Sequence, residues 1–102
     1  MQIDIPETCG EDFISRDAGQ RIRNLIVANW DAPSIELLTK GKTIASVSFF
    51  DEAIGLLSKR GGKLWPEIIG KLKFPDLSPG DRMLLNSVVK ARRDEEALGR
   101  RT

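Results

Sequence analysis

The chain has 102 residues, of which 40% are hydrophobic and 30% charged, and its formal net charge is +1. A chain of this length forms one domain with a modest core, and a nearly neutral chain has no overall field to attract nucleic acid or an anionic membrane. The sequence has no histidine and one cysteine, Cys9, which excludes a histidine-activated nucleophile, an intrachain disulfide and a structural zinc site. We therefore expect no metal and no cofactor. The lack of an apolar leader segment predicts a cytoplasmic protein.

The N-terminal segment predicts a short strand followed by irregular structure. Apolar and polar residues alternate in MQIDI, which indicates a strand that ends at Pro6. We expect a loop over PETCGED and a second short extended piece at Phe13 and Ile14.

The next two elements are a helix and a strand. Apolar residues at spacings of three and four predict a helix from Arg16 to Asn29 with Ser15 as its N-cap. On this helix we expect Arg23 to lie on the solvated face. Ser34 to Leu38 is β-compatible, and its two consecutive leucines indicate a central strand buried on both faces.

The stretch SVSFFDEAIG predicts the start of a two-faced helix. Ser48 and Asp51 have the spacing of a capping box, with Ser48 as the N-cap. Phe49, Ile54 and Leu57 fall on one side at helical spacing, which predicts that they are buried.

The last third predicts a strand from Lys71 to Phe74 and a final helix that begins near Ser78 and ends near Glu96. We expect Leu84 and Val88 to face the core. Basic residues near the end of this helix complement its dipole; they are Lys90, Arg92, Arg93, Arg100 and Arg101.

Strands and helices thus alternate three times along the chain. This order predicts a single α/β domain over residues 1–102, with a mixed, partly parallel sheet packed against about three helices.

Two motifs of the chain resemble the bacterial STAS-like domain family of unknown function. They have the forms S/T-R-x-x-G-x-x-[IL]-R and S-x-S-F-x-D-E-x-x-G, and with KLKFPDLSPGDRMLLNSVV the likeness covers about residues 12 to 93. The family commonly has an acid where this chain has Leu38 and an apolar residue where it has Lys42. The matching positions are Ser15, Arg16, Gly19, Ile22, Arg23, Ser46, Ser48, Phe49, Asp51, Glu52 and Gly55.

The resemblance implies a STAS-like fold and a regulatory role. STAS domains include anti-sigma factor antagonists, in which a partner kinase phosphorylates a serine at the start of the equivalent helix and so prevents binding. The likeness places that serine near Asp51, where an acid resembles a permanently charged state or an unused switch. It implies a non-catalytic interaction module of bacterial signalling or transcriptional control, with a histidine-kinase-like ATPase or another regulator as its protein partner.

We expect the partner to bind an exposed stripe at the start of the middle helix, because a glycine on a solvated helix face would let a partner backbone approach closely. The residues of this stripe are Ser46, Ser48, Asp51, Glu52, Gly55 and Ser58.

An alternative is a small nucleotide- or anion-binding domain, in which Arg16, Arg23 and the helix start at Ser48 hold the anion. Catalysis by Asp51 and Glu52 is not expected, because adjacent residues of a helix point about 100° apart and do not converge as a dyad. Nucleic-acid binding is not expected either, because no stacking aromatic platform accompanies the basic C-terminal residues.

Overall fold

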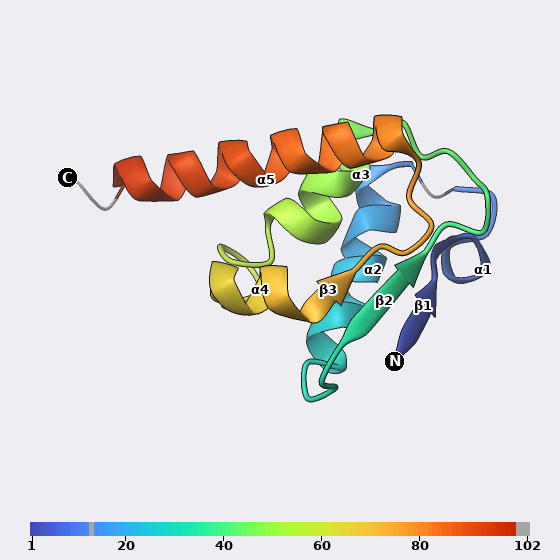
Figure 1. The fold of residues 1–102 in the computed structure, drawn as a ribbon, viewed down its shortest axis with the longest axis horizontal. Coiled ribbons are helices and arrows are strands. Elements are labelled where there is room, and N and C mark those ends of the chain that lie inside the picture. The colour runs from blue at the N-terminus through green and yellow to red at the C-terminus, as the bar shows by residue number, and fades with distance from the viewer. Residues whose placement is uncertain (13, 100–102) are drawn as a thin grey trace.

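The computed structural model describes residues 1–12 and 14–99, and within these residues it forms a three-stranded parallel sheet covered by helices (Figure 1). The strands are β1 (Gln2–Asp4), β2 (Ile35–Leu38) and β3 (Leu72–Lys73). They are ordered β1-β2-β3, so the predicted central position of β2 is confirmed. Both pairings are parallel. The sheet of the described strands is therefore entirely parallel, whereas we expected a mixed, partly parallel sheet.

The sheet has one buried face. Ile35 and Leu37 of β2 are fully buried and pair with Leu72 of β3 and Ile3 of β1 on the same face. The opposite face is more polar and partly open to solvent, and Leu38 there is only half-buried. The prediction that the two leucines indicate burial on both faces is therefore wrong.

Helices fill the connections between the strands and follow the last one. Pairing β1 with β2 and β2 with β3 in parallel requires one crossover after β1 and one after β2, and helices supply both crossovers. Their bounds are α1 (Ile5–Cys9), α2 (Arg16–Ala28), α3 (Val47–Phe50), the π-helix η1 (Asp51–Gly55), α4 (Trp65–Lys71) and α5 (Pro79–Gly99).

Helix α1 occupies the segment for which we expected a loop. The side chain of Asp4 accepts a hydrogen bond from the amide of Glu7 at 3.0 Å and so caps the helix, while Pro6 sits in its first turn. This helix buries the Cys9 thiol in the core, and burial raises the pKa of that thiol. Ile14 lies in a bend, and Phe13 is outside the described residues.

Helix α2 follows its prediction except at Arg23. The hydroxyl of Ser15 accepts a hydrogen bond from the Ala18 amide at 3.1 Å, as expected of the N-cap. Ala18 and Ile22 are buried on the core face. Arg23 is also buried, with 6% of its surface exposed, so its predicted place on the solvated face is wrong.

The start of the middle helix differs from the predicted capping box. Ser46, and not Ser48, is the N-cap of α3, and its hydroxyl accepts from the Phe49 amide at 3.1 Å. The chain arrives there through Ala45, whose φ is 49°. The buried carboxylate of Asp81 fixes this turn, because it accepts from the amide of Ala45 at 2.8 Å. The helix therefore begins two residues earlier than expected.

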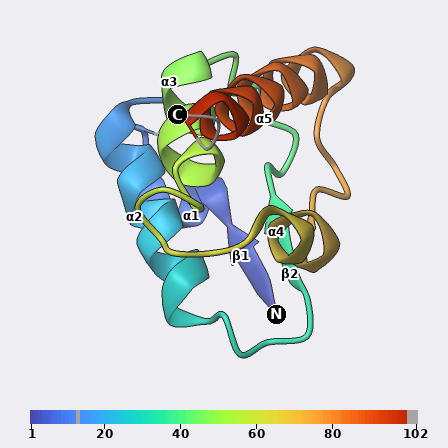
Figure 2. The same ribbon diagram turned by 90° about the vertical axis from the view of Figure 1, so that its left-hand side faces the viewer.

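Helix α5 lies across α3 and η1 and extends beyond the rest of the molecule (Figure 1). Its 21 residues rise about 1.5 Å each and so span about 31 Å, much of the longest dimension of 42 Å. Ser78 precedes it and its hydroxyl accepts from the Asp81 amide at 3.2 Å, which confirms the predicted start. In Figure 2, α2 and α4 lie on opposite sides of the view, and α5 passes above α4.

The predicted core residues are largely buried. Phe49, Ile54, Leu57 and Val88 are each at most 6% exposed, as their helical spacing predicted. Leu84 is only half-buried, because it lies at the edge of the face that α5 turns to η1.

Candidate functional site

The two acidic residues of the expected exposed stripe are instead buried in an ion-pair cluster. Asp51 and Glu52 are 9% and 6% exposed, and Gly55 is buried with them. Around the two carboxylates stand four guanidinium groups, from α2, from the turn after η1 and from α5; we call these six residues the carboxylate cluster. Its members are Arg16, Arg23, Asp51, Glu52, Arg60 and Arg92.

Asp51 joins α5 to η1. Arg92 donates to both oxygens of the Asp51 carboxylate, with Nε and Nη2 each 2.7 Å from an oxygen. Bidentate hydrogen bonds between charged groups are among the stronger ones in proteins. Arg16 adds a contact at 3.4 Å. The hydrogen bonds from Arg92 outweigh the effect of burial and lower the pKa of Asp51 below its ordinary value.

Glu52 joins α2 to η1. Burial alone would raise its pKa, but the hydrogen bonds from Arg16 at 2.9 Å and Arg23 at 3.2 Å outweigh burial and lower the pKa. Arg60 approaches the same carboxylate at 3.3 Å. Arg23 also donates to the backbone carbonyl of Glu52, so this buried guanidinium is held by both the side chain and the main chain.

Two glycines allow the elements of the cluster to pack this closely. A Cβ at Gly19 of α2 would lie 2.8 Å from the Cβ of Glu52 and from the Phe49 carbonyl oxygen. A Cβ at Gly55 would lie 2.6 Å from the Asp51 carboxylate and 2.9 Å from Val88. Gly55 therefore has an internal packing role, and the expected approach of a partner backbone is not needed to explain it.

The serines of the expected stripe lie around the cluster and not within it. Ser46 is half-buried, and its hydroxyl donates to the Ile14 carbonyl at 2.6 Å while it caps α3. Ser48 and Ser58 are half-buried. Of the expected anion site, Arg16 and Arg23 do come together at Glu52, but no hydrogen bond within the described residues joins Ser48 to either arginine.

The cluster is suited to hold elements together and not to transfer protons. Both carboxylates have lowered pKa values and are ionised near neutral pH. Every buried side-chain nitrogen or oxygen of the described residues has a hydrogen-bond partner. The cluster thus ties α2, η1 and α5 into one packed unit.

The carboxyl end of the sheet is occupied by further aspartates that sequence reasoning missed. Ligands of α/β proteins often bind there, but in this chain carboxylates hold the loops closed. Asp76 accepts from the amides of Thr39 and Lys40 at 2.8 and 3.0 Å, and the hydrogen bond from the Thr39 amide lowers its pKa despite burial. Asp81 holds Ile44 and Ala45 in the same way.

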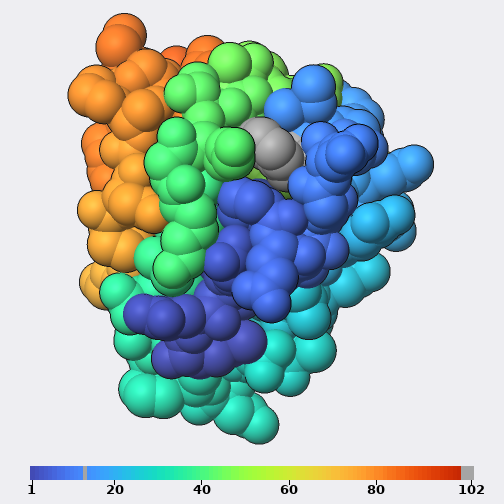
Figure 3. Space-filling model, turned by 90° about the vertical axis from the view of Figure 1, so that its right-hand side faces the viewer, coloured from blue at the N-terminus to red at the C-terminus, as the bar shows by residue number. Residues whose placement is uncertain are grey.

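Figure 3 shows this end of the molecule, with α1 packed beside the segment that links β2 to α3. The loops lie directly against one another here.

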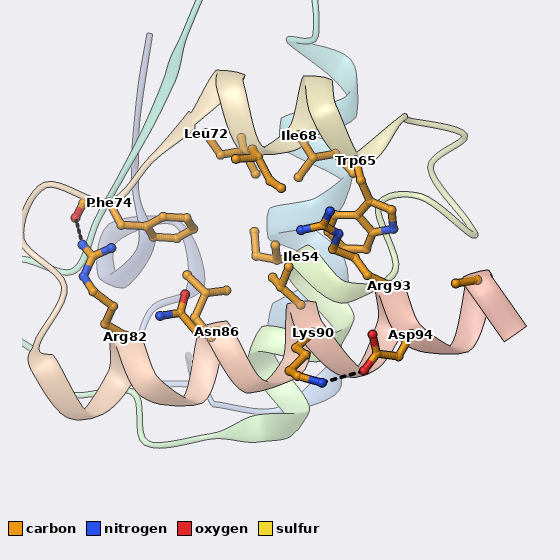
Figure 4. A pocket seen from close by; sticks show the side chains of 14 residues that line it. Ile54, Trp65, Ile68, Leu72, Phe74, Arg82, Asn86, Lys90, Arg93 and Asp94 are labelled. Carbon is orange, nitrogen blue, oxygen red and sulfur yellow. Dashed lines mark hydrogen bonds and ion pairs between the residues drawn. The ribbon is translucent and has the colours of Figure 1, made fainter.

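An open groove lies between α4 and α5, and we call it the α4–α5 groove (Figure 4). Its volume is about 610 Å³. Its floor and first wall come from η1, α4, β3 and the residue after β3, and they are apolar: Ile54, Trp65, Ile68, Ile69, Leu72 and Phe74. Its second wall is one stripe of α5: Arg82, Leu85, Asn86, Val89, Lys90, Arg93, Asp94 and Ala97.

Hydrogen bonds close the groove at both ends. Near the start of α5, Arg82 donates to the carbonyl of Phe74 at 2.8 Å (Figure 4). Toward the far end, the indole Nε1 of Trp65 donates to the carboxylate of Glu96. Between these two contacts α4 and α5 remain apart, and Ile69 on the rim is 52% exposed.

The rim of the groove is mainly basic. Lys90 pairs with Asp94 at 2.7 Å on the exposed surface, whereas Arg82 and Arg93 form no ion pair within the described residues. The expectation that basic residues here only complement the helix dipole is thus incomplete. Arg92 instead belongs to the carboxylate cluster, and Arg100 and Arg101 lie outside the described residues.

The wall of the groove that α5 forms could have been predicted in part from the sequence. In α5, positions 82, 86, 89, 93 and 97 repeat at spacings of three and four, which marks a second helix face beside the core-facing one. The opposite wall could not be found in this way, because it depends on where α4 and β3 pack.

Within the described part of the chain, no helix is long and apolar enough to span a membrane, and no group of three or more Cys, Asp or Glu side chains is placed to hold a metal ion. Comparisons with protein-family models, curated proteins and solved structures found no match to this chain.

Proposed function

We propose that the chain is a non-catalytic regulatory module of STAS-like type, acting in bacterial signalling or transcriptional control, and that it binds its protein partner at the α4–α5 groove. The observation that carries this proposal is the groove itself. It combines an apolar floor, an exposed isoleucine at its rim and arginines that have no carboxylate partner among the described residues. Protein interfaces combine an apolar centre and a polar rim in the same way.

The burial of the carboxylate cluster supports this choice of surface. A partner could reach Asp51 or Gly55 only by separating α5 from η1, because Arg92 and Val88 contact them. Glu52 is already paired with Arg16, Arg23 and Arg60. Breaking the partly buried ion pair of Asp51 with Arg92 would cost about 2–3 kcal/mol, which a partner contact would first have to offset. The groove needs no such rearrangement.

The placement of the motif residues supports the STAS-like assignment. Arg16, Gly19 and Arg23 of the first motif meet Glu52 of the second motif, and Gly55 of the second motif packs against Asp51 of the same cluster. Residues shared by a family for the sake of its fold are expected to meet in this way. The partner would then be a histidine-kinase-like ATPase or another regulator.

Anion binding is the second candidate, and the excess of four guanidinium groups over two carboxylates favours it. Arg16 and Arg60 are the more exposed members of the cluster. The carboxylate of Glu52 already contacts Arg16 at 2.9 Å and Arg60 at 3.3 Å. An anion would have to compete with this carboxylate for both side chains. We therefore favour protein binding.

Site-specific photo-crosslinking tests the proposal. Benzoylphenylalanine is placed at Ile69 on the groove rim, or at Val47 beside the serines of the expected stripe, in cells that naturally express the chain. The two positions are matched, because their side chains are 52% and 54% exposed. We expect a discrete crosslinked protein from position 69 and none from position 47.

A protein that crosslinks from position 47 and not from position 69 would place the interface at the start of α3. The absence of a product at both positions would contradict protein binding at either surface. Circular dichroism of both purified variants shows whether each has kept its fold.

A further inference from the structure

We propose that the α4–α5 groove receives an acidic amphipathic helix of the partner. This inference rests on the proposed function, since it names the chemistry of the partner that the same groove binds. The helix would lie between α4 and α5, with apolar side chains toward the floor and carboxylates toward the basic rim.

The charges of the rim define the acidic character of this helix. Arg82 and Arg93 lie on the same stripe of α5 and have no ion pair within the described residues. They are separated by three helical turns, or about 16 Å. Lys90 has only an exposed pair with Asp94, which is worth little and can exchange for another carboxylate. Glutamates along one edge of a bound helix would meet this row of cations.

The shape of the groove defines the helical character. Its two closing contacts involve Arg82 and Glu96 of α5, and at about 1.5 Å per residue these positions are about 21 Å apart. An amphipathic helix of about 14 residues has this length, and it can direct residues at i, i+3, i+4 and i+7 into an apolar groove. Ile68 and Leu72 of the floor point toward α5 in Figure 4 and would meet those side chains.

Two other occupants fit less well. A second copy of the chain that inserted its own α5 would bring Arg82, Lys90 and Arg93 against the same cations, and like charges at an interface are costly. A nucleic acid would satisfy the cations, but its phosphates would gain nothing from the apolar floor at Ile54 and Ile68.

Two designed peptides test the inference. Each is a stapled helix of about 15 residues, the length that matches the groove, with leucines at i, i+4, i+7 and i+11. One has glutamates along both flanks, and the other has lysines at the same positions. Fluorescence anisotropy with the whole chain should give an affinity for the glutamate peptide about tenfold or more above that for the lysine peptide, and the difference should shrink in high salt.

Two charge-reversal variants locate the binding. Arg93→Glu removes an unpaired cation of the rim. It should lower the affinity for the glutamate peptide about tenfold and raise the affinity for the lysine peptide. Lys42→Glu makes the same charge change at an exposed position outside the groove and should change neither affinity. In amide NMR spectra, the glutamate peptide should shift the resonances of Ile69, Val89 and Arg93.

Equal binding of both peptides, absence of binding, or shifts confined to residues outside the groove would overturn the inference. Self-association of the chain that shifts these same groove resonances would assign the groove to a second copy, and tighter binding of a DNA duplex than of the glutamate peptide would assign it to nucleic acid. If neither peptide binds while position 69 still crosslinks a protein, the proposal of an acidic partner helix is wrong and the proposed function stands. If both fail, the proposed function is contradicted as well.

Discussion

At the scale of single residues, the packing of α2, η1 and α5 depends on buried charged side chains that pair with one another. Asp51, Glu52 and Arg23 fall on positions that a helical repeat assigns to solvent, yet each is buried. Burial of one charge would cost several kcal/mol, but opposite charges with good hydrogen bonds offset most of that cost. The carboxylates were visible in the sequence, whereas Arg16, Arg23 and Arg92 come from positions 29 to 41 residues away.

This pairing predicts a pH dependence of stability. The pKa of Asp51 is lowered in the folded chain by Arg92, so its contribution to the free energy of unfolding is fully present above the ordinary carboxyl value. It is lost as the pH falls through the lower folded value. Asp51→Asn should reduce the free energy of unfolding at neutral pH by about 2–3 kcal/mol. It should also flatten the loss of stability below about pH 4. Urea unfolding from neutral to acidic pH measures both effects.

Asp94→Asn is the matched control, because Asp94 also pairs with a cation but lies on the exposed surface. Its effect at neutral pH should be under about 0.5 kcal/mol. Equal losses for the two variants would show that the contact of Asp51 with Arg92 contributes no more than a surface pair.

At the scale of elements, the longer helices and the central strand were predictable and the short elements were not. Helix α2 and helix α5 have repeated apolar spacing and N-caps at Ser15 and Ser78, and both occur as expected. Helix α1 has five residues and depends on the cap at Asp4, so its local signal was too weak. Strand β3 is Leu72–Lys73 and is shorter than expected at both ends; at its start, Lys71 belongs to α4.

The π-helix η1 is the element whose geometry depends most on a single residue. The amide of Leu56 donates to the Asp51 carbonyl, five residues before it, at 2.9 Å, which widens the helix. At the same place, Gly55 lets Val88 of α5 come within 2.9 Å of where a Cβ would stand. Close packing against α5 thus requires glycine here.

The close contact of Gly55 with Val88 predicts that alanine in place of glycine has opposite effects on stability at positions 55 and 70. Gly55→Ala should lower the free energy of unfolding by about 1–3 kcal/mol, because the added methyl group overpacks the contact with Asp51 and Val88. Gly70→Ala, in α4, has no atom within 4 Å of the new methyl group and should stabilise the chain by about 0.5–1 kcal/mol. Denaturant midpoints compare the two. A Gly55→Ala variant as stable as Gly70→Ala would contradict the packing role of Gly55.

At the scale of the whole molecule, alternation of strands and helices predicted an α/β domain with a partly parallel sheet and β2 at its centre. The structure confirms the α/β class and the central place of β2, but the sheet of the described strands is entirely parallel and not mixed. The candidate site was not predictable to the same degree. The α4–α5 groove joins Ile54, Trp65 and Arg93 from three separate elements, and their meeting depends on how α5 lies across η1. Periodicity describes the faces of one element and contains no information on such a meeting.

The central claim is that the protein partner binds at the α4–α5 groove and not at the start of α3. Two substitutions of equal chemistry test it most directly, Ile69→Glu in the groove and Val47→Glu beside Ser46 and Ser48, because both side chains are exposed to nearly the same degree. The measurement is the affinity of each variant for the protein that crosslinks to the chain. We expect Ile69→Glu to weaken binding about tenfold or more, by placing a charge among the apolar contacts of the interface, and Val47→Glu to bind as the unchanged chain does. Loss of binding in Val47→Glu with full binding in Ile69→Glu would contradict the account.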